Sequence, residues 1–121
     1  VNAFGGYSIQ GKSTAKAKKL VEEAKILESL GCFGVVLECI PSDLSKVITD
    51  AVSISTIGIG AGPDVDGQVL VLQDMLGMNN EIKPKFVRHY LEGSELVKNA
   101  LNSFHKDVLC LQYPLKKESY T

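Results

Sequence analysis

A glutamate ends an apolar run of the chain, and its position there suggests acid–base chemistry. In "VVLECIP", three residues that favour strands, Val35 to Leu37, are followed by Glu38, a cysteine, an isoleucine and a proline. A carboxylate at the end of a buried strand is partly desolvated and is suited to accept a proton, so Glu38 is a candidate general base. A surface acid that ends the strand, or that pairs with a lysine of the next helix, explains the same pattern without chemistry.

A glycine-rich segment, "TIGIGAG", ends the next apolar run. Its glycines, Gly58, Gly60 and Gly62, have GxGxG spacing, and no helix is expected directly after them, which argues against a dinucleotide-binding fingerprint. Glycines at a strand end let the backbone approach a ligand closely, or pack a tight turn. Gly60, Ala61 and Gly62 are therefore candidate substrate-binding residues.

Other residues that can bind metals are scattered along the sequence. Asp64 and Asp66 could hold a hard cation through oxygen, but two loop aspartates before Gly67 more often form turns. His89 and His105 lie on expected helices and have no partner at ligand spacing. The cysteines have no CxxC spacing and predict neither a zinc site nor a disulfide framework; they are Cys32, Cys39 and Cys110.

The elements that would position these residues alternate between helix and strand. Apolar residues at helical spacing predict a helix from Ser13 to Leu30, and the run from Cys32 to Glu38 predicts a strand buried on both faces. A second helix is expected from Ser42, followed by strands over Ser53 to Gly60 and Gln68 to Gln73.

The remainder predicts helices from Lys85 to Leu91 and from Ser94 to about Leu109, and then an aperiodic tail. This order is typical of an α/β protein whose parallel strands are joined by right-handed crossovers. In such sheets the chemistry collects at the carboxyl ends of the strands, where Glu38 and Gly60 both lie.

Composition narrows the class of protein. The 121 residues are 45% hydrophobic and carry a formal net charge of -1, which fits one globular domain and provides no basic field for nucleic acid or an anionic membrane. No apolar stretch reaches the roughly 20 residues that span a bilayer, and no signal peptide opens the chain. These features predict a soluble, intracellular protein.

The motifs taken together carry a specific resemblance. "GGYSIQGK", "EAKILESLGCFGVVLECIP", "ITDAVSISTIGIGAGPDVDGQVLVLQDMLGM" and "PKFVRHYLEG", in this order, resemble the ketopantoate hydroxymethyltransferase family over nearly the whole chain. The family fold is a (β/α)8 TIM barrel, which usually takes roughly 250 residues. The resemblance therefore implies that residues 1–121 form a single segment, the C-terminal half of a barrel, with a loop at 1–12 and terminal helices and a tail at 84–121.

The resemblance also implies an activity. The family transfers a hydroxymethyl group from 5,10-methylenetetrahydrofolate to α-ketoisovalerate, giving ketopantoate for pantothenate and coenzyme A biosynthesis. Glu38 matches the glutamate that removes the C3 proton of the keto acid. The family uses Mg²⁺ to hold the keto acid, through residues of its N-terminal half, so no metal ligand is expected in this chain. A homo-oligomer is implied, in the cytoplasm or in the mitochondria of a eukaryote, and this chain alone is expected to be inactive.

Two other functions stay open. A half-barrel with uncovered edge strands and apolar surface could be a non-catalytic module that mediates subunit association. The glycine-rich loop could instead belong to a small flavodoxin-like phosphate binder.

Overall fold

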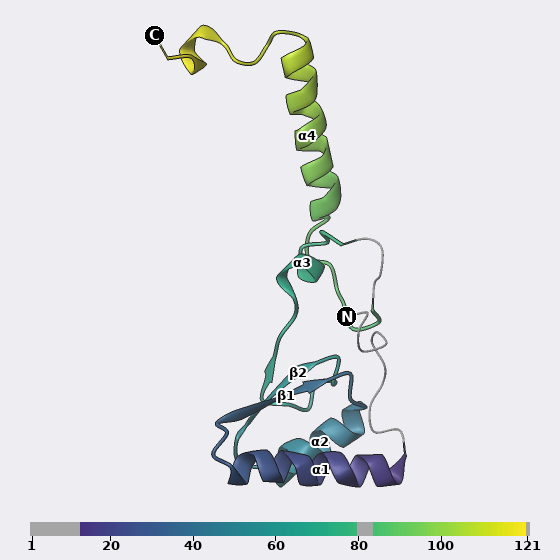
Figure 1. Ribbon diagram of the computed structural model, residues 1–121. Helices are drawn as coiled ribbons and strands as arrows, with labels where there is room; N and C mark the ends of the chain where they lie inside the picture. The colour runs from purple at the N-terminus through teal and green to yellow at the C-terminus, as the bar shows by residue number, and fades with distance from the viewer. Residues whose placement is uncertain (1–12, 80–83, 121) are drawn as a thin grey trace. The chain divides into compact units, whose positions relative to one another are not determined.

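The computed structural model describes residues 13–79 and 84–120, which form two compact units (Figure 1). Unit 1 comprises residues 13–71 and 84–87, and unit 2 comprises residues 72–79 and 88–120. The loop predicted at residues 1–12 lies outside the described residues. Among the described helices, none is both long enough and apolar enough to cross a membrane.

Helix α1 (Thr14–Ser29) opens unit 1 and confirms the first predicted helix. Ser13 caps its start, because the Ser13 hydroxyl accepts a hydrogen bond from the Lys16 backbone N–H at 3.3 Å. Gly31 follows the end of the helix with a φ of +88°, a conformation that glycine adopts without a steric penalty. One face of the helix packs into the core of unit 1, where Ala24 is buried.

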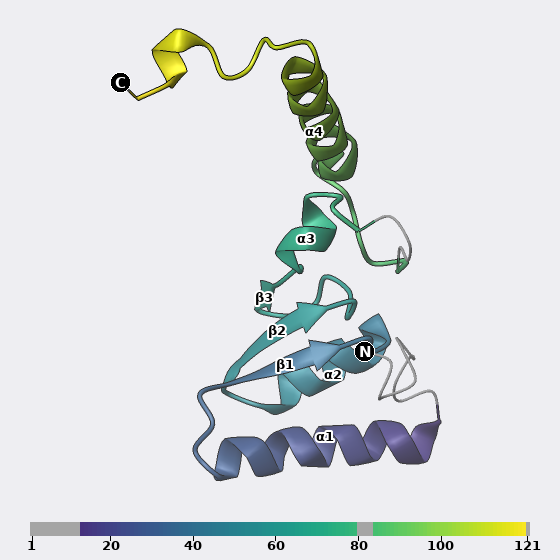
Figure 2. The same cartoon turned by 45° about the horizontal axis from the view of Figure 1, so that its top comes forward.

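The sheet of unit 1 has parallel strands in the order β1–β2–β3 (Figure 2). Strand β1 (Gly34–Glu38) pairs with β2 (Ser55–Ile59), so that Leu37 lies opposite Gly58 and Glu38 lies opposite Ile59. Strand β3 (Gly67–Gln68) pairs with the other side of β2. The described residues thus form an α/β unit with parallel strands, as predicted, and do not include a closed barrel.

Only one face of this sheet is covered. Helix α2 (Ser42–Ala51) connects β1 to β2, and α1 and α2 lie on the same side of the two strands (Figure 2). Their apolar residues meet Leu37 in the core, where Ile48 is 1% exposed. Val36 points to the opposite face and is 62% exposed. The prediction of a strand buried on both faces is therefore wrong for the described structure, because Val36 and Glu38 of β1 are exposed on this second face.

A buried polar network fixes the start of β2. Thr56 is fully buried, and its backbone N–H and hydroxyl both donate to Asp66 Oδ2, at 2.7 and 3.0 Å. The Asp66 N–H donates back to the Thr56 hydroxyl oxygen at 3.2 Å. Thr49 Oγ1 of α2 lies 2.9 Å from the same oxygen and is the donor, since the Thr56 proton goes to Asp66. Asp66 is thus a structural residue that anchors the β2–β3 loop.

Two sequence predictions of secondary structure are wrong. The strand expected at Gln68–Gln73 ends at Gln68, and helix α3 (Leu72–Met75) begins inside the expected range. Short apolar runs fit strand and helix equally well, which explains this error. The helix expected at Lys85–Leu91 is absent from the structure, which has a turn there, with the Val87 N–H bonded to the Pro84 carbonyl at 2.9 Å.

Unit 2 contains α3, α4 (Gly93–Leu109) and a short 3-10 helix, η2 (Lys116–Glu118). Helix α4 confirms the prediction of a helix from Ser94 to about Leu109. Its start is tied to the turn after α3, because the Gly93 N–H donates to the Leu76 carbonyl at 2.8 Å. A Cβ at Gly93 would collide with that carbonyl, so the close approach requires glycine.

The Thr56–Asp66 network predicts a measurable difference between two aspartates of one loop. We expect Asp66→Ala to lower the free energy of unfolding by about 2 kcal/mol, because it leaves the buried Thr56 N–H and hydroxyl without their acceptor. Asp64→Ala is the matched control, since Asp64 is exposed and should change stability by less than about 0.5 kcal/mol. Urea unfolding followed by circular dichroism measures both, and equal losses would contradict the structural role of Asp66.

Candidate functional site

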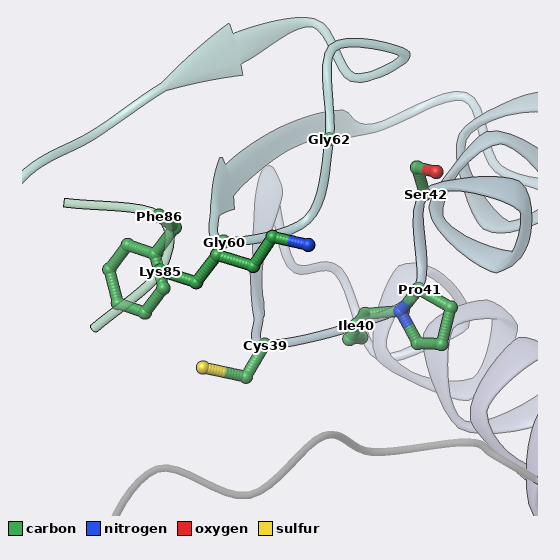
Figure 3. Close-up of a pocket in the computed structure, with 8 residues that line it drawn as sticks. All are labelled: Cys39, Ile40, Pro41, Ser42, Gly60, Gly62, Lys85 and Phe86. Atoms are coloured by element: carbon green, nitrogen blue, oxygen red, sulfur yellow. The ribbon is translucent and has the colours of Figure 1, made fainter. Parts of the chain in front are cut away.

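A cavity of about 570 Å³ lies in unit 1, next to the carboxyl ends of β1 and β2 (Figure 3). Three segments contribute its wall: residues 39–42 after β1, Gly60 and Gly62 after β2, and the turn that carries Lys85 and Phe86. The volume is in the range of small-molecule sites. The structure therefore has a concave site where the strand order predicts chemistry.

The wall after β1 is formed where the strand ends abruptly. The Cys39 N–H still donates to the Ile59 carbonyl at 2.9 Å, but Cys39 has a φ of 54° and turns the chain out of the extended conformation. Ile40 is then buried in the core. Pro41 precedes the first turn of α2 with no side-chain cap, and Ser42 begins the helix at the cavity wall.

The wall after β2 depends on two glycines with positive φ. Gly60 has a φ of +67°, and a Cβ there would lie 2.7 Å from Cδ1 of Phe86. Gly62 has a φ of +82°, and a Cβ there would collide with Ser42. The Gln68 side-chain amide also holds this wall, because it donates to the Gly62 carbonyl at 2.8 Å. Both glycines are thus required by close packing as well as by their backbone conformation.

The structure places two of the predicted site residues in the cavity wall and the others outside it. Gly60 and Gly62 line the cavity, whereas the Ala61 side chain is fully buried in the hydrophobic core. Glu38 is exposed and is not part of the cavity wall, so the desolvation expected for a carboxylate at the end of a buried strand is not found in the described structure. It lies beside the cavity, since it directly precedes Cys39, and it occupies the sheet face opposite to the buried Leu37.

Electrostatics connect Glu38 to the cavity wall. Burial, and secondly the negative charge of Glu38, raise the pKa of the Cys39 thiol above its usual value. The protonated thiol is a poor nucleophile and a weakly polar surface. Cys39 therefore contributes a neutral wall near the Glu38 carboxylate.

Sequence patterns did not identify Lys85 and Phe86 as site residues, because both were expected on a helix. In the structure both residues line the cavity next to Gly60 and Gly62, although they are distant from these glycines in the sequence. Pro84 was the local sequence signal for a turn in place of the expected helix, because a proline is compatible with a turn as well as with a helix start. Local pattern alone does not show that Gly60 faces an aromatic ring.

Metal-binding residues do not gather in the described parts of the chain. In residues 13–79 and 84–120, no cluster of three or more His, Cys, Asp or Glu side chains is suited to hold a metal ion. Asp66 accepts hydrogen bonds from Thr56. His89 Nδ1 lies 3.8 Å from the Glu92 carboxylate, and His105 is exposed on α4, both in unit 2.

Comparison with known proteins identifies the family. A family model described as ketopantoate hydroxymethyltransferase matches residues 1–116. The chain belongs to this family. Among curated relatives, 3-methyl-2-oxobutanoate hydroxymethyltransferase of Bdellovibrio bacteriovorus is 55% identical over 121 residues, which are 100% of this chain and 46% of the relative. The protein of the same name from Francisella tularensis is 52% identical over 120 residues, 99% of this chain and 46% of the relative.

The 3-methyl-2-oxobutanoate hydroxymethyltransferase of Coxiella burnetii shows the same partial coverage. It is 53% identical over 114 residues, which are 94% of this chain and 43% of the relative. The chain thus spans less than half the length of these relatives. These matches confirm the resemblance found in the sequence and the transferase class of the family.

Gly62 and Gly31 offer a matched pair that separates backbone strain from packing. Both have positive φ, but a Cβ at Gly31 would meet nothing within 4 Å, whereas a Cβ at Gly62 would collide with Ser42. We expect Gly31→Ala to cost about 1 to 2 kcal/mol from the backbone alone, and Gly62→Ala to cost about 1 to 3 kcal/mol more from overpacking. Urea unfolding measures both losses. Equal losses would show that the chain after β2 does not need the close contact with Ser42.

The Cys39 thiol provides a probe of the Glu38 charge. We expect the rate of Cys39 alkylation by iodoacetamide to rise at a higher pH than for an ordinary thiol, because its pKa is raised. Glu38→Gln should shift this profile to lower pH, since the neutral amide no longer disfavours the thiolate. Peptide mass spectrometry across a pH series measures the reaction, and Glu22→Gln on α1 is the control. The same profile in wild type and Glu38→Gln would mean that the two side chains are not close.

Proposed function

We propose that Glu38 is the general base of a hydroxymethyltransferase that converts α-ketoisovalerate to ketopantoate, with 5,10-methylenetetrahydrofolate as the one-carbon donor. One observation carries the assignment: Glu38 ends β1 on the sheet face that α1 and α2 leave uncovered. In a β/α barrel the helices surround the sheet, so the uncovered face corresponds to the interior, and active sites lie at the carboxyl ends of the strands.

The chemistry needs a base at the carbon next to the keto group. The Glu38 carboxylate accepts the C3 proton of the keto acid, and the electron pair of that C–H bond enters the enolate. C3 of the enolate then forms the new C–C bond to the methylene carbon of the folate, while the bonds from that carbon to N5 and N10 break. Water supplies the hydroxyl group of the new hydroxymethyl, and the C3 proton held by Glu38 and the remaining proton of the water go to the two folate nitrogens. With one water consumed, the products are ketopantoate and tetrahydrofolate.

The Mg²⁺ that the resemblance implies has no ligand set in the described residues. Residues 13–79 and 84–120 contain no suitable cluster, and Asp66 is already hydrogen-bonded to Thr56. We propose that its ligands belong to the portion of the family's length that this chain does not span.

The same partial coverage supports the proposal that this chain is inactive alone. It spans less than half of the relatives, so residues that bind the keto acid in the rest of the barrel are needed with Glu38. Association through the uncovered face, where Val36 is exposed and β1 is an edge strand, stays a prediction. The homo-oligomer and the cytoplasmic location also stay predictions.

A chimera tests the role of Glu38 in a full-length protein. The resemblance places this chain in the C-terminal half of the family, so the N-terminal half of the Bdellovibrio bacteriovorus relative, joined ahead of residue 1, would supply the portion of the relative's length that this chain does not span. We expect the chimera to exchange the C3 hydrogen of α-ketoisovalerate for deuterium and to form ketopantoate. Glu38→Gln should lower both rates by about 10²- to 10⁴-fold, because the amide cannot accept the proton.

Glu23→Gln is the control for this experiment, because Glu23 is an exposed acid on α1 that pairs with Lys19. It should leave both rates unchanged. Proton NMR follows the exchange, and mass spectrometry follows the product. An active Glu38→Gln chimera would contradict the assignment of the base, and activity of residues 1–121 alone would contradict the need for the missing portion.

A further inference from the structure

We propose that Lys85 is a specificity-determining residue, which binds the carboxylate of a substrate in the cavity at the carboxyl ends of β1 and β2. The apolar part of that substrate would lie against Cys39, Ile40 and Phe86. The choice of ligand rests on the proposed function, whose two substrates, the keto acid and the folate, both carry carboxylates.

The position of the lysine supports this role. Figure 3 shows the Lys85 side chain extending across Gly60, with its nitrogen inside the ring of labelled cavity residues. Among the described residues that line the cavity it is the charged one, and it forms no ion pair with any described residue. The ammonium is therefore available to a ligand, and its three N–H groups are donors that suit a carboxylate.

The backbone that carries Lys85 is held on both sides. Phe86 packs against Gly60, where even a single added carbon would come within 2.7 Å of the ring. Val87 is buried, and its N–H closes the turn onto the Pro84 carbonyl at 2.9 Å. The lysine stem thus starts from a fixed point while its side chain remains exposed, so binding orders only the side chain.

The other residues of the cavity wall favour a ligand that is apolar apart from its carboxylate. Ile40, Pro41 and the Phe86 ring are apolar, and burial and the Glu38 charge keep the Cys39 thiol neutral. An apolar wall with one convergent cation is the pattern of a site for a small organic anion. A purely hydrophobic ligand would leave the lysine unused, and an inorganic anion would leave the apolar wall unused.

The neighbouring base strengthens the argument. Glu38 directly precedes Cys39 of the cavity wall, and its negative charge contributes to the raised pKa of the Cys39 thiol. A second anion that enters this region is repelled by Glu38 unless a positive charge compensates it. Among the residues of the cavity wall, Lys85 supplies that charge.

The test is a titration of the isotopically labelled chain, followed through the backbone amide signals of Gly60, Gly62 and Ser42. The probes are α-ketoisovalerate, 5-formyltetrahydrofolate as a stable reduced folate, and 3-methylbutan-2-one as the uncharged counterpart of the keto acid. We expect at least one carboxylate to shift these signals. We expect Lys85→Gln to weaken its binding about tenfold, Lys85→Arg to retain it, and added salt to weaken it.

Lys25→Gln is the control, because Lys25 is an exposed lysine of unit 1 on α1. A Lys85-dependent shift with α-ketoisovalerate alone identifies the keto acid as the ligand, and one with 5-formyltetrahydrofolate alone identifies the folate. The proposal is overturned if neither carboxylate shifts these signals, if Lys85→Gln binds as well as wild type, or if the uncharged ketone binds equally well.

This binding test is separate from the test of the base. The amide shifts measure ligand binding near Lys85 and do not require turnover. If the Glu38→Gln chimera kept its activity, the assignment of the general base would be contradicted, but a positive titration would still support the Lys85 proposal. Conversely, a failed titration would remove the Lys85 proposal and leave the Glu38 result intact. Spectra of the free variants also verify that each variant is folded.

Discussion

The absence of side chains at Gly60 and Gly62 is the constraint on which the site depends. At one position the Phe86 ring occupies the space of a Cβ, and at the other Ser42 at the start of α2 does so. These two contacts bring three segments that are distant in sequence to one wall. Without them the cavity would lose either the turn that carries Lys85 or its border with α2.

A second constraint is the alternation of side chains along β1, which places Leu37 in the core and Glu38 on the opposite face of the sheet. Residues on one face of β1 and β2 pack under α1 and α2, and the alternation of the strand places Glu38 on the other face. The carboxylate is therefore kept out of the hydrophobic core while the strand that carries it is anchored there through Leu37. A strand end with this arrangement can present an acid without the cost of a buried, unpaired charge.

Sequence patterns predicted those parts of the fold that depend on local periodicity. Helices α1 and α4 are long and amphipathic, so their positions follow from spacing, and the position of Glu38 at the end of β1 follows from the apolar run that ends on it. The turn at Pro84–Val87 was missed, because it depends on contact between Phe86 and Gly60, which leaves no periodic signal. The loop aspartates were ambiguous until Asp66 was found bonded to the buried Thr56.

The loop between β2 and β3 links the site to the stability of the fold. Because β3 is parallel to β2, this loop must return from the carboxyl end of β2, where Gly62 lines the cavity, to the amino end, where Asp66 binds Thr56. Evolution therefore has little freedom to reshape this side of the wall, since a change in the loop also acts on a structural anchor. The exposed side chain of Lys85 carries no such anchor, so the fold constrains a change of ligand selectivity less at this residue than in the loop.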